Sequence, residues 1–426
     1  MLEGAAPGRH LSFDILSRPS DTRAMIELEQ ACQRIFAALV PLPPEPIPLD
    51  AAVGRVASEP ILSPIDLPSF DNSAVDGYAV SATDLRAARP EAPAKLELLG
   101  RVAAGQVFAG KVRPGTCVRL FTGSALPPGA DAVVMQEDAQ LGATEPPQVS
   151  FAEPVKPWEN TRLRGEDVKR GAELLPAGDR LTAMGVGLLS AVGLQALQVA
   201  RRPRIGLLAT GNELVEPGQP LPAAKIYESN RTALAALLTA AGALPRAYAA
   251  VPDTLAATAA VLEQALAECD GLLTTGGVSV GELDFVKNAF EQIGGEIQFW
   301  TVAMKPGKPF VFGRWKQKFL FGLPGNPVSA VVAFLLLVRP ALLRWQGATR
   351  VELPAHPGQL AESLVNRGDR RHFVRVTVDE SGHVRSAGMQ ASHSLRSLAA
   401  ANGLVDVPPQ TTWPAGTVVR VMRLDF

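Results

Sequence analysis

Cysteine and histidine are scarce in this sequence, and their spacing excludes several kinds of site. Three cysteines, Cys32, Cys117 and Cys269, stand far apart among 426 residues and form no CxxC pair. A disulfide framework or a zinc knuckle is therefore not expected. The five histidines show no HxxxH spacing, which argues against a histidine-ligated metal. We expect reduced thiols in a cytoplasmic protein.

An excess of one charge and long apolar runs are also missing. Lysine and arginine total 41 against 42 acids, for a formal net charge of -1, so neither a nucleic-acid partner nor attraction to a membrane surface is expected. The longest apolar stretch, at 328–338, is too short to span a bilayer and has Pro340 just beyond it. It predicts a buried helix. The first 23 residues lack the apolar core of a secretory signal and predict a flexible lead-in.

The rest of the chain divides into unlike patterns. Residues 24–41 begin with apolar side chains at helical spacing and end in a proline-rich run. Short β-like runs punctuated by glycine and proline follow as far as residue 200. From 201 to 347 continuous apolar strands alternate with helical segments, which predicts a doubly wound α/β domain. Short strands return over 348–426 and predict a small C-terminal β domain. In the α/β part, Ser229 or Asn230 is the expected N-cap of a helix that Gly242 ends.

Three glycine-rich loops follow predicted strands of the α/β domain. They read ATGNEL at 209–214, TTGGVSVGELD at 274–284 and LPGNPVSA at 323–330. Ligands of open α/β sheets bind outside the carboxyl ends of the strands, where these loops should meet. One glycine-rich turn is more often a plain strand-to-helix connection, but three together favour a ligand that carries phosphate.

Acids and a helix start accompany these glycines. Glu213 lies in the first loop, and Glu282 and Asp284 lie in the second. Asn326 and Pro327 suit the start of a helix whose free N–H groups can face an anion. Because carboxylates repel phosphate, we infer a bridging Mg²⁺ that both can bind. Neither a Walker A nor a GxSxG pattern is present.

A further loop, KPGKPFVFG at 305–313, places Lys305 and Lys308 three residues apart on a backbone stiffened by proline. Lysine is a compact charge that suits an oxyanion. Alone, this segment is typical of a solvated turn. Beside three glycine-rich loops it indicates an anion site.

The β-rich half contains dense polar motifs around Asp76, Thr122 and Asp167. They read DLPSFDNSAVDGYAV at 66–80, RLFTGSALPPGAD at 119–131 and RLRGEDVKRG at 162–171. Asp76 precedes Gly77 and Tyr78 and has no evident capping role. Read alone, the three motifs are polar turns.

Taken together and in their order along the chain, the seven motifs resemble those of the molybdopterin molybdenumtransferase family, the bacterial MoeA proteins related to the gephyrin E domain. The resemblance covers residues 24–426. It implies Mg²⁺-dependent insertion of molybdenum from molybdate into adenylylated molybdopterin, with release of AMP. The sequence does not distinguish molybdate from tungstate. The implied partners are a second copy of the chain, the molybdopterin adenylyltransferase and the enzymes that receive the cofactor, with no nucleic acid and no membrane.

The same resemblance implies the architecture. The expected fold class is multidomain α/β plus β, with a molybdopterin-binding α/β domain, a β-rich N-terminal half and a small C-terminal β-barrel-like domain. The implied domains are a helix at 24–41 packed on the α/β domain, a linker domain from 42–60 and 164–200, a β-rich domain at 61–163, the α/β domain at 201–347 and the C-terminal domain at 348–426.

Site residues follow position by position from the resemblance. The functional carboxylates are Asp76, Asp167, Glu213, Asp253 and Asp284, and the expected metal ligands among them are Glu213, Asp253 and Asp284. The ligand-binding residues are Thr122, Gly276, Gly277, Ser279, Lys305, Lys308, Pro309, Pro324, Asn326, Pro327, Ser329, Arg375 and Ser392. Arg370 and Ser394 are alternatives for the last two. The family often has aspartate where this chain has Asn212, so the metal role passes to Glu213.

Two other functions compete with molybdenum insertion. The adenylylating enzyme of the same pathway shares the α/β domain and the GGVS-type loop, but it is essentially that domain alone, whereas this chain adds two β-rich regions. A scaffold role, as in gephyrin, is a non-enzymatic alternative, but no additional domain or long linker in the sequence suggests it.

Overall fold

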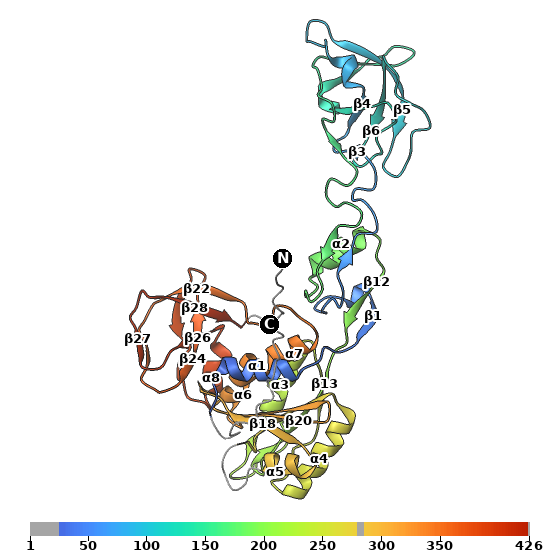
Figure 1. Ribbon diagram of the computed structural model, residues 1–426. Helices are drawn as coiled ribbons and strands as arrows, with labels where there is room; N and C mark the ends of the chain where they lie inside the picture. Colours follow the sequence, from blue (N-terminus) through green and yellow to red (C-terminus); the bar gives the residue numbers. More distant parts are fainter. Residues whose placement is uncertain (1–24, 279–284, 425–426) are drawn as a thin grey trace, which may run out of the picture. The chain divides into compact units, whose positions relative to one another are not determined.

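Figure 1 shows the computed structural model of the chain, in which residues 25–278 and 285–424 are described. Contacts divide the chain into two units, residues 1–45 with 200–426 and residues 46–199. The predicted lead-in over residues 1–23 lies outside the described residues.

A six-stranded sheet forms the centre of the first unit. Its order is β16 (Leu244–Ala247), β13 (Arg204–Ala209), β17 (Gly271–Thr275), β21 (Lys318–Leu323), β20 (Pro309–Trp315) and β18 (Glu296–Thr301). The first four strands are parallel, and β20 and β18 add an antiparallel edge. The parallel part arises from alternating strands and helices, and the edge arises from a hairpin between β20 and β21.

Helices cover both faces of this sheet, which explains the continuous apolar runs of its strands. Leu207 and Phe321 belong to a core shared with α1 (Leu28–Ala38), α3 (Asn230–Ala240) and the long helix that begins at Pro327. Their neighbours Leu208 and Leu320 belong to the opposite core, with α4 (Leu255–Glu268) and α5 (Phe285–Gln292). Because successive side chains of a strand point to opposite faces, both must be apolar here.

The long helix runs from Pro327 to Trp345 and continues through Pro340. It comprises α6 (Pro327–Ala333), a π-helical turn (Phe334–Val338) and α7 (Arg339–Trp345). Proline offers no N–H to the carbonyl four residues earlier, which belongs to Leu336. That carbonyl instead accepts a hydrogen bond from Cys32 Sγ of α1 at 3.5 Å. By length and composition this helix could cross a membrane, but 83% of its apolar window is buried inside the protein, as in a core helix.

The start of α3 differs from the expectation in one respect. Ser229 occupies the N-cap position, but its side chain makes no capping hydrogen bond. Glu228 Oε1 accepts the N–H of Arg231 at 2.9 Å instead. The side chain of Asn230 does not cap the helix and instead donates to Thr275 and to the Gly325 carbonyl. At the other end Gly242 follows the helix with φ +84°, as predicted.

A small closed barrel completes the first unit. Its strands run in the order β24 (Arg371–Val378), β25 (His383–Ser386), β22 (Ala355–Leu360), β28 (Val418–Arg423) and β26 (Gly403–Val407), and β26 pairs with β24 to close the barrel. The short strand β19 (Met304–Lys305) pairs in parallel with β24 and joins the lysine loop to the barrel. Two short strands, β23 (Leu364–Asn366) and β27 (Thr411–Trp413), pair beside it, and α8 (Leu395–Ala400) precedes β26. An apolar core of valine and leucine fills the barrel.

The second unit contains a six-stranded mixed sheet over residues 77–151. Its order is β7 (Ala132–Met135), β4 (Gly77–Val80), β6 (Thr116–Leu120), β5 (Ala94–Val102), β9 (Gln148–Phe151) and β8 (Ala139–Leu141). Two apolar clusters pack on its faces, one around Phe151 and one around Val118. The strand β3 (Asn72–Ser73), which leads into β4, pairs with β10 (Thr161–Arg162).

A separate core is formed by residues that lie near the two ends of the segment 46–199 in the sequence. It gathers Leu49, Ile61, Leu181 and Leu189 around the helix α2 (Ala183–Ala191). The strands near it are β1 (Pro44–Pro48) with β12 (Ala196–Ala200) and β2 (Ile61–Leu62) with β11 (Glu173–Leu175). Short 3₁₀ turns complete the unit at Leu49–Ala51, Ala82–Leu85 and Gln136–Asp138.

All three cysteines are free thiols, in agreement with the sequence. Burial raises the pKa of Cys32 to about 11 and that of Cys117 to about 12, and burial also raises the pKa of Cys269. The protonated thiol of Cys32 can therefore donate to the Leu336 carbonyl at neutral pH.

Gly77 gives the first testable prediction, because a Cβ there would lie 2.1 Å from the Val134 carbonyl oxygen of the adjacent strand β7. Gly77→Ala should lower the free energy of unfolding of the second unit by about 1–3 kcal/mol through overpacking. Gly187→Ala is the control, since an added Cβ on α2 meets no atom within 4 Å. It should raise stability by about 0.5–1 kcal/mol. Urea unfolding of both variants measures this, and equal stabilities would contradict the prediction.

Candidate functional site

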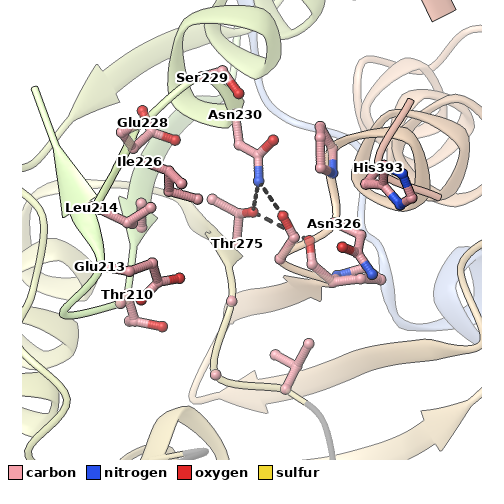
Figure 2. A pocket seen from close by; sticks show the side chains of 18 of the residues that line it. Thr210, Glu213, Leu214, Ile226, Glu228, Ser229, Asn230, Thr275, Asn326 and His393 are labelled. Carbon is pink, nitrogen blue, oxygen red and sulfur yellow. Dashed lines mark hydrogen bonds between the residues drawn. The ribbon is translucent and has the colours of Figure 1, made fainter. Parts of the chain in front are cut away.

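A cavity of about 740 Å³ lies at the carboxyl ends of β13, β17 and β21 (Figure 2). This is the position that the sheet topology favours for a ligand. Eight of the residues predicted from the sequence line it: Glu213, Asp253, Gly276, Gly277, Pro309, Pro324, Asn326 and Pro327.

The glycine loop after β17 passes too close to its neighbours to carry side chains. Gly276 and Gly277 have φ of +85° and +67°. A Cβ on Gly276 would lie 2.6 Å from the Thr210 carbonyl oxygen, and one on Gly277 would lie 2.7 Å from Val286 Cγ2. Only glycine combines this backbone with this spacing. The cavity wall is therefore main chain here, open to close approach by a ligand.

Thr210 adds a polar group beside these glycines. Its side chain lines the cavity and is 8% exposed, and within the described residues its Oγ1 has no hydrogen-bond partner. A buried hydroxyl without a partner is costly unless a ligand or water satisfies it. The hydroxyl of Thr210 thus lies against the glycine loop with its hydrogen-bonding capacity unused by the described residues.

Asn230 ties three segments together at the cavity wall. Its Nδ2 donates to Thr275 Oγ1 and to the Gly325 carbonyl, both at 2.8 Å (Figure 2). Thr275 Oγ1 donates in turn to the Pro324 carbonyl at 3.2 Å. The start of α3, the end of β17 and the loop after β21 are held in one arrangement by these bonds.

Three acids line the cavity: Glu228 is paired with Arg231, whereas Glu213 and Asp253 reach the cavity from separate loops. Asp253 Oδ2 accepts the N–H of Asn212 at 2.9 Å, and Asn212 Oδ1 accepts the N–H of Asp253 at 3.2 Å. This reciprocal pair needs a side-chain oxygen at position 212 but no charge, which accounts for asparagine there. A Cβ on Gly211 would lie 2.6 Å from Glu213 Oε2, so glycine lets this carboxylate fold over the loop.

Glu213 and Asp253 could hold Mg²⁺ only together with oxygen atoms of a ligand or of water. No group of three or more His, Cys, Asp or Glu residues that could hold a metal occurs over 25–278 and 285–424. Mg²⁺ in phosphate-binding enzymes usually takes only one or two carboxylates, with water and substrate oxygens as its other ligands. Glu213 and Asp253 supply two hard oxygen donors beside the cavity. Asp284 and Ser279, which were also predicted, lie outside the described residues.

The lysine loop packs against the start of the long helix. Gly307 has φ +104°, and a Cβ there would lie 3.5 Å from the Ser329 carbonyl oxygen. The Lys308 carbonyl accepts the N–H of Val302 at 3.0 Å. Lys305 and Lys308 are exposed, whereas Ser329 is buried beneath the loop. The backbone of the loop is therefore fixed while both ammonium groups face solvent.

Arg375 is a fully buried cation of the barrel. Its Nη2 donates to the carbonyls of Met389 and Ala391 at 2.7 and 3.2 Å, and its Nε donates to Ser397 Oγ at 3.1 Å. Its Nη1 has no partner in the described part of the chain. The alternative, Arg370, donates to the Met304 carbonyl at 3.3 Å. Arg375 thus braces the 389–392 loop instead of facing solvent.

That loop meets the first turn of the long helix. The Ser392 carbonyl accepts the N–H of Val328 at 3.1 Å. The next residue, His393, lines the cavity close to Asn326 (Figure 2). The alternative Ser394 stands at the N-cap position of α8. The barrel therefore contributes one side of the cavity.

Asp76 and Thr122 form a close pair in the second unit. Asp76 Oδ1 accepts hydrogen bonds from the Thr122 N–H and the Thr122 Oγ1, both at 2.8 Å. These bonds, with the charge of Arg119, hold the pKa of Asp76 below its usual value. Asp167 is exposed in the same unit, where its N–H donates to the Leu67 carbonyl.

Further residues that line the cavity were not predicted as site residues, among them Thr210, Glu228, Asn230, Thr275 and His393. The sequence indicates Asn230 only as a possible helix cap, and it places Thr210 and Thr275 in two of the glycine-rich loops without giving them a role. Their places at the carboxyl ends of predicted strands were the available signal for the threonines. Glu228 and His393 stand in no recognisable motif, and their position in the cavity depends on the tertiary fold.

Comparison with known proteins agrees with this geometry. Three family profiles match in order: the MoeA N-terminal region (domain I and II) over residues 26–193, a probable molybdopterin binding domain over 206–344, and the MoeA C-terminal region (domain IV) over 357–424. A molybdopterin molybdenumtransferase of Haemophilus influenzae is 38% identical over 384 residues, 89% of this chain and 93% of that protein. The chain belongs to the MoeA family.

Further relatives support MoeA membership. Molybdopterin molybdenumtransferase 2 of Mycobacterium tuberculosis is 38% identical over 94% of this chain and 98% of its own length. The crystal structure of a molybdopterin biosynthesis MoeA protein from Pyrococcus horikoshii matches with a TM-score of 0.81 at 31% identity, over 95% of this chain and 100% of that one. The predicted family and fold class are confirmed. MoeA membership places the chain among the transferases of molybdenum cofactor biosynthesis.

The pair of Asp76 and Thr122 gives a prediction about pKa. Thr122→Val removes the hydroxyl donor and should raise the pKa of Asp76 toward its usual value, whereas Thr122→Ser keeps the donor and should leave it low. Because the folded-state pKa is depressed, the stabilisation is present above the unfolded-state pKa and is lost as the pH falls through the folded value. NMR titration of the carboxyl carbon measures this, and identical pKa values in all three proteins would refute it.

Proposed function

We propose that the protein inserts molybdenum from molybdate into adenylylated molybdopterin and releases AMP in an Mg²⁺-dependent reaction. The observation that carries this proposal is the cavity, where a wall of glycine main chain and two carboxylates lie together. Main-chain surfaces of this kind suit phosphate oxygens, and carboxylates suit the cation that accompanies them. The 38% identical relatives are named molybdopterin molybdenumtransferases, which supports this proposal.

The phosphoanhydride of the substrate would lie against the Gly276–Gly277 wall. Thr210 Oγ1 would donate to one of its oxygens, which satisfies the buried hydroxyl. Glu213 and Asp253, with Asp284, would hold Mg²⁺, which when bound neutralises charge on the anhydride. The helix that begins at Pro327 directs its N-terminus at the cavity, where the partial positive charge of the helix dipole favours an anion.

Molybdate, the second substrate, would bind at the lysine loop. Lys305 pairs in the β19–β24 ladder with His372. Burial, with the positive charges of Lys305 and Arg375, lowers the pKa of His372 to about 4. The positive charges of Lys305 and Arg375 that act on this imidazole would also favour a dianion bound nearby. Exposed Lys305 and Lys308 would supply the charge-assisted hydrogen bonds.

The reaction balances with these two substrates and water. The two dithiolene sulfurs replace one oxygen of molybdate, which leaves as water with the two thiol protons. Hydrolysis of the anhydride then releases AMP and leaves the phosphate on molybdopterin. The residues of the cavity contribute by holding both substrates and their charge in place, not by forming a covalent intermediate.

We also infer a homodimer whose subunits share each site. Large apolar side chains stand exposed on neighbouring segments of the second unit: Leu62, Ile65, Phe70, Trp158 and Leu163. Such a group of exposed side chains is typical of a protein interface. Asp76, Thr122 and Asp167 of one subunit would then complete the cavity of the other. The adenylyltransferase would supply the substrate, and cofactor-dependent enzymes would receive the product.

Loss of one lysine gives the first functional prediction. Lys308→Ala should bind adenylylated molybdopterin nearly as well as the wild type but release AMP slowly at low molybdate. Losing one charge-assisted hydrogen bond costs about 1.5–3 kcal/mol, or roughly ten- to a hundredfold in affinity for molybdate. Raised molybdate should restore the rate. AMP release from purified substrate, followed by chromatography, measures this.

Two controls separate the anion sites. Lys316→Ala removes an exposed lysine that lies over the Trp315 ring, away from the cavity, and should behave as the wild type. Asp253→Ala removes an expected metal ligand and should not be rescued by molybdate. The proposal is wrong if the wild type releases no AMP. The assignment of Lys308 is wrong if Lys308→Ala loses the pterin nucleotide itself.

A complementation experiment tests the shared site. At low molybdate, Asp76→Ala and Lys308→Ala should each release AMP much more slowly than the wild type. Random mixing of their subunits should restore about a quarter of the wild-type activity, because half of the dimers are mixed and each carries one intact site. Light scattering should show a dimer at the concentration used in the assay. No recovery by a demonstrated mixed dimer would exclude a site shared between subunits.

A further inference from the structure

Two tryptophans on the antiparallel edge of the α/β sheet make closely similar contacts. Trp300 Nε1 donates to the Val278 carbonyl at 2.8 Å, and Trp315 Nε1 donates to the Ile293 carbonyl at 2.8 Å. Both rings are half-buried against the same apolar core, and a lysine lies over each. Nothing in the local chemistry distinguishes them.

Their acceptors distinguish them. Val278 is the last described residue of the glycine loop and lines the cavity. Its side chain is 3% exposed and packs so closely that a Cβ on Gly322 would lie 2.7 Å from it. Ile293 follows α5 and does not line the cavity. The same hydrogen bond thus holds a ligand-facing loop in one case and a helix end in the other.

Trp300 also stands directly before the lysine loop. It lies on β18, where the next residue, Thr301, pairs with Pro309. Val302 then donates to the Lys308 carbonyl at 3.0 Å. The hydrogen bond from Trp300 to the Val278 carbonyl therefore links β18, which leads to the lysine loop, with the glycine loop.

A second contact strengthens this link from the other side of the glycine loop. Lys287 Nζ lies 4.6 Å from the centroid of the Trp300 ring, in a cation–π contact from α5. Val286, its neighbour on α5, lies against the position that a Cβ of Gly277 would take, at 2.7 Å. The glycine loop, α5 and β18 therefore meet at Trp300.

We propose that Trp300 is a positioning residue that fixes the glycine loop relative to the lysine loop through its hydrogen bond to Val278. Trp300 is not among the residues that line the cavity, and it acts through the Val278 backbone, which does line it. The consequence for activity rests on the proposed function, in which one substrate lies at each loop. A misplacement of reacting groups by a fraction of an ångström lowers turnover more than it lowers the binding of either substrate alone.

The experiment compares Trp300→Phe with Trp315→Phe in the full-length protein. Each variant loses one indole N–H donor from the antiparallel edge of the sheet, so the two variants should lose similar thermal stability. Hydrogen–deuterium exchange of residues 274–278 should become faster in Trp300→Phe only. With adenylylated molybdopterin, molybdate and Mg²⁺, Trp300→Phe should release AMP with kcat/KM lowered roughly three- to tenfold, the scale of one hydrogen bond. The kcat/KM of Trp315→Phe should match that of the wild type.

The exchange measurement tests the positioning role of Trp300, and the turnover measurement also tests the proposed function. Unchanged exchange at 274–278 in Trp300→Phe, or an equal effect of Trp315→Phe, overturns the positioning role whether or not the protein releases AMP. A wild type that releases no AMP refutes the proposed function and leaves the exchange result to decide the role of Trp300. If Trp300→Phe does not fold, Lys287→Met against Lys316→Met provides the same comparison, with faster exchange expected for the first only.

Discussion

A contact between two main-chain segments sets the geometry of the cavity. The Thr210 carbonyl oxygen lies 2.6 Å from the place where Gly276 would carry a Cβ, so the loops after β13 and β17 can approach only as bare backbone. With these two loops in contact, Thr275 accepts a hydrogen bond from Asn230 and donates one to the Pro324 carbonyl in the loop before the long helix. The hydroxyl of Thr210 loses its access to water in the same step. Placement of the acids and exposure of polar main chain both depend on this approach.

The sequence predicts those parts of the fold that depend on local patterns. Apolar runs such as those containing Leu207 and Leu208 identify buried parallel strands, and Gly242 identifies a helix end. Asn230 and His393 could not be assigned in this way, since each stands alone and gains its place from segments distant along the chain. The same is true of Arg375, whose burial depends on closure of the barrel. Tertiary context decides what a single polar residue does.

The barrel and the α/β sheet are joined through the lysine loop. The two residues of β19 belong to the ladder of β24, while Pro309 directly after the loop belongs to β20 of the larger sheet. The lysine loop is therefore anchored at one end to the barrel and at the other end to the α/β sheet, and both anchors limit its motion. A stiff attachment at both ends limits the positions that two long, flexible lysine side chains can take, which reduces the entropy lost when they bind an anion.

The three protonated thiols make it simpler to study how the chain moves. Raised pKa values keep Cys32, Cys117 and Cys269 protonated at neutral pH, where thiol-directed reagents attack only the ionised form. The native protein should therefore resist maleimides without removal of its own cysteines. A cysteine introduced on an exposed turn of each unit would accept a spin label or a dye selectively. Distances between the two units could then be followed in solution, in a background that still keeps the bond from Cys32 to Leu336.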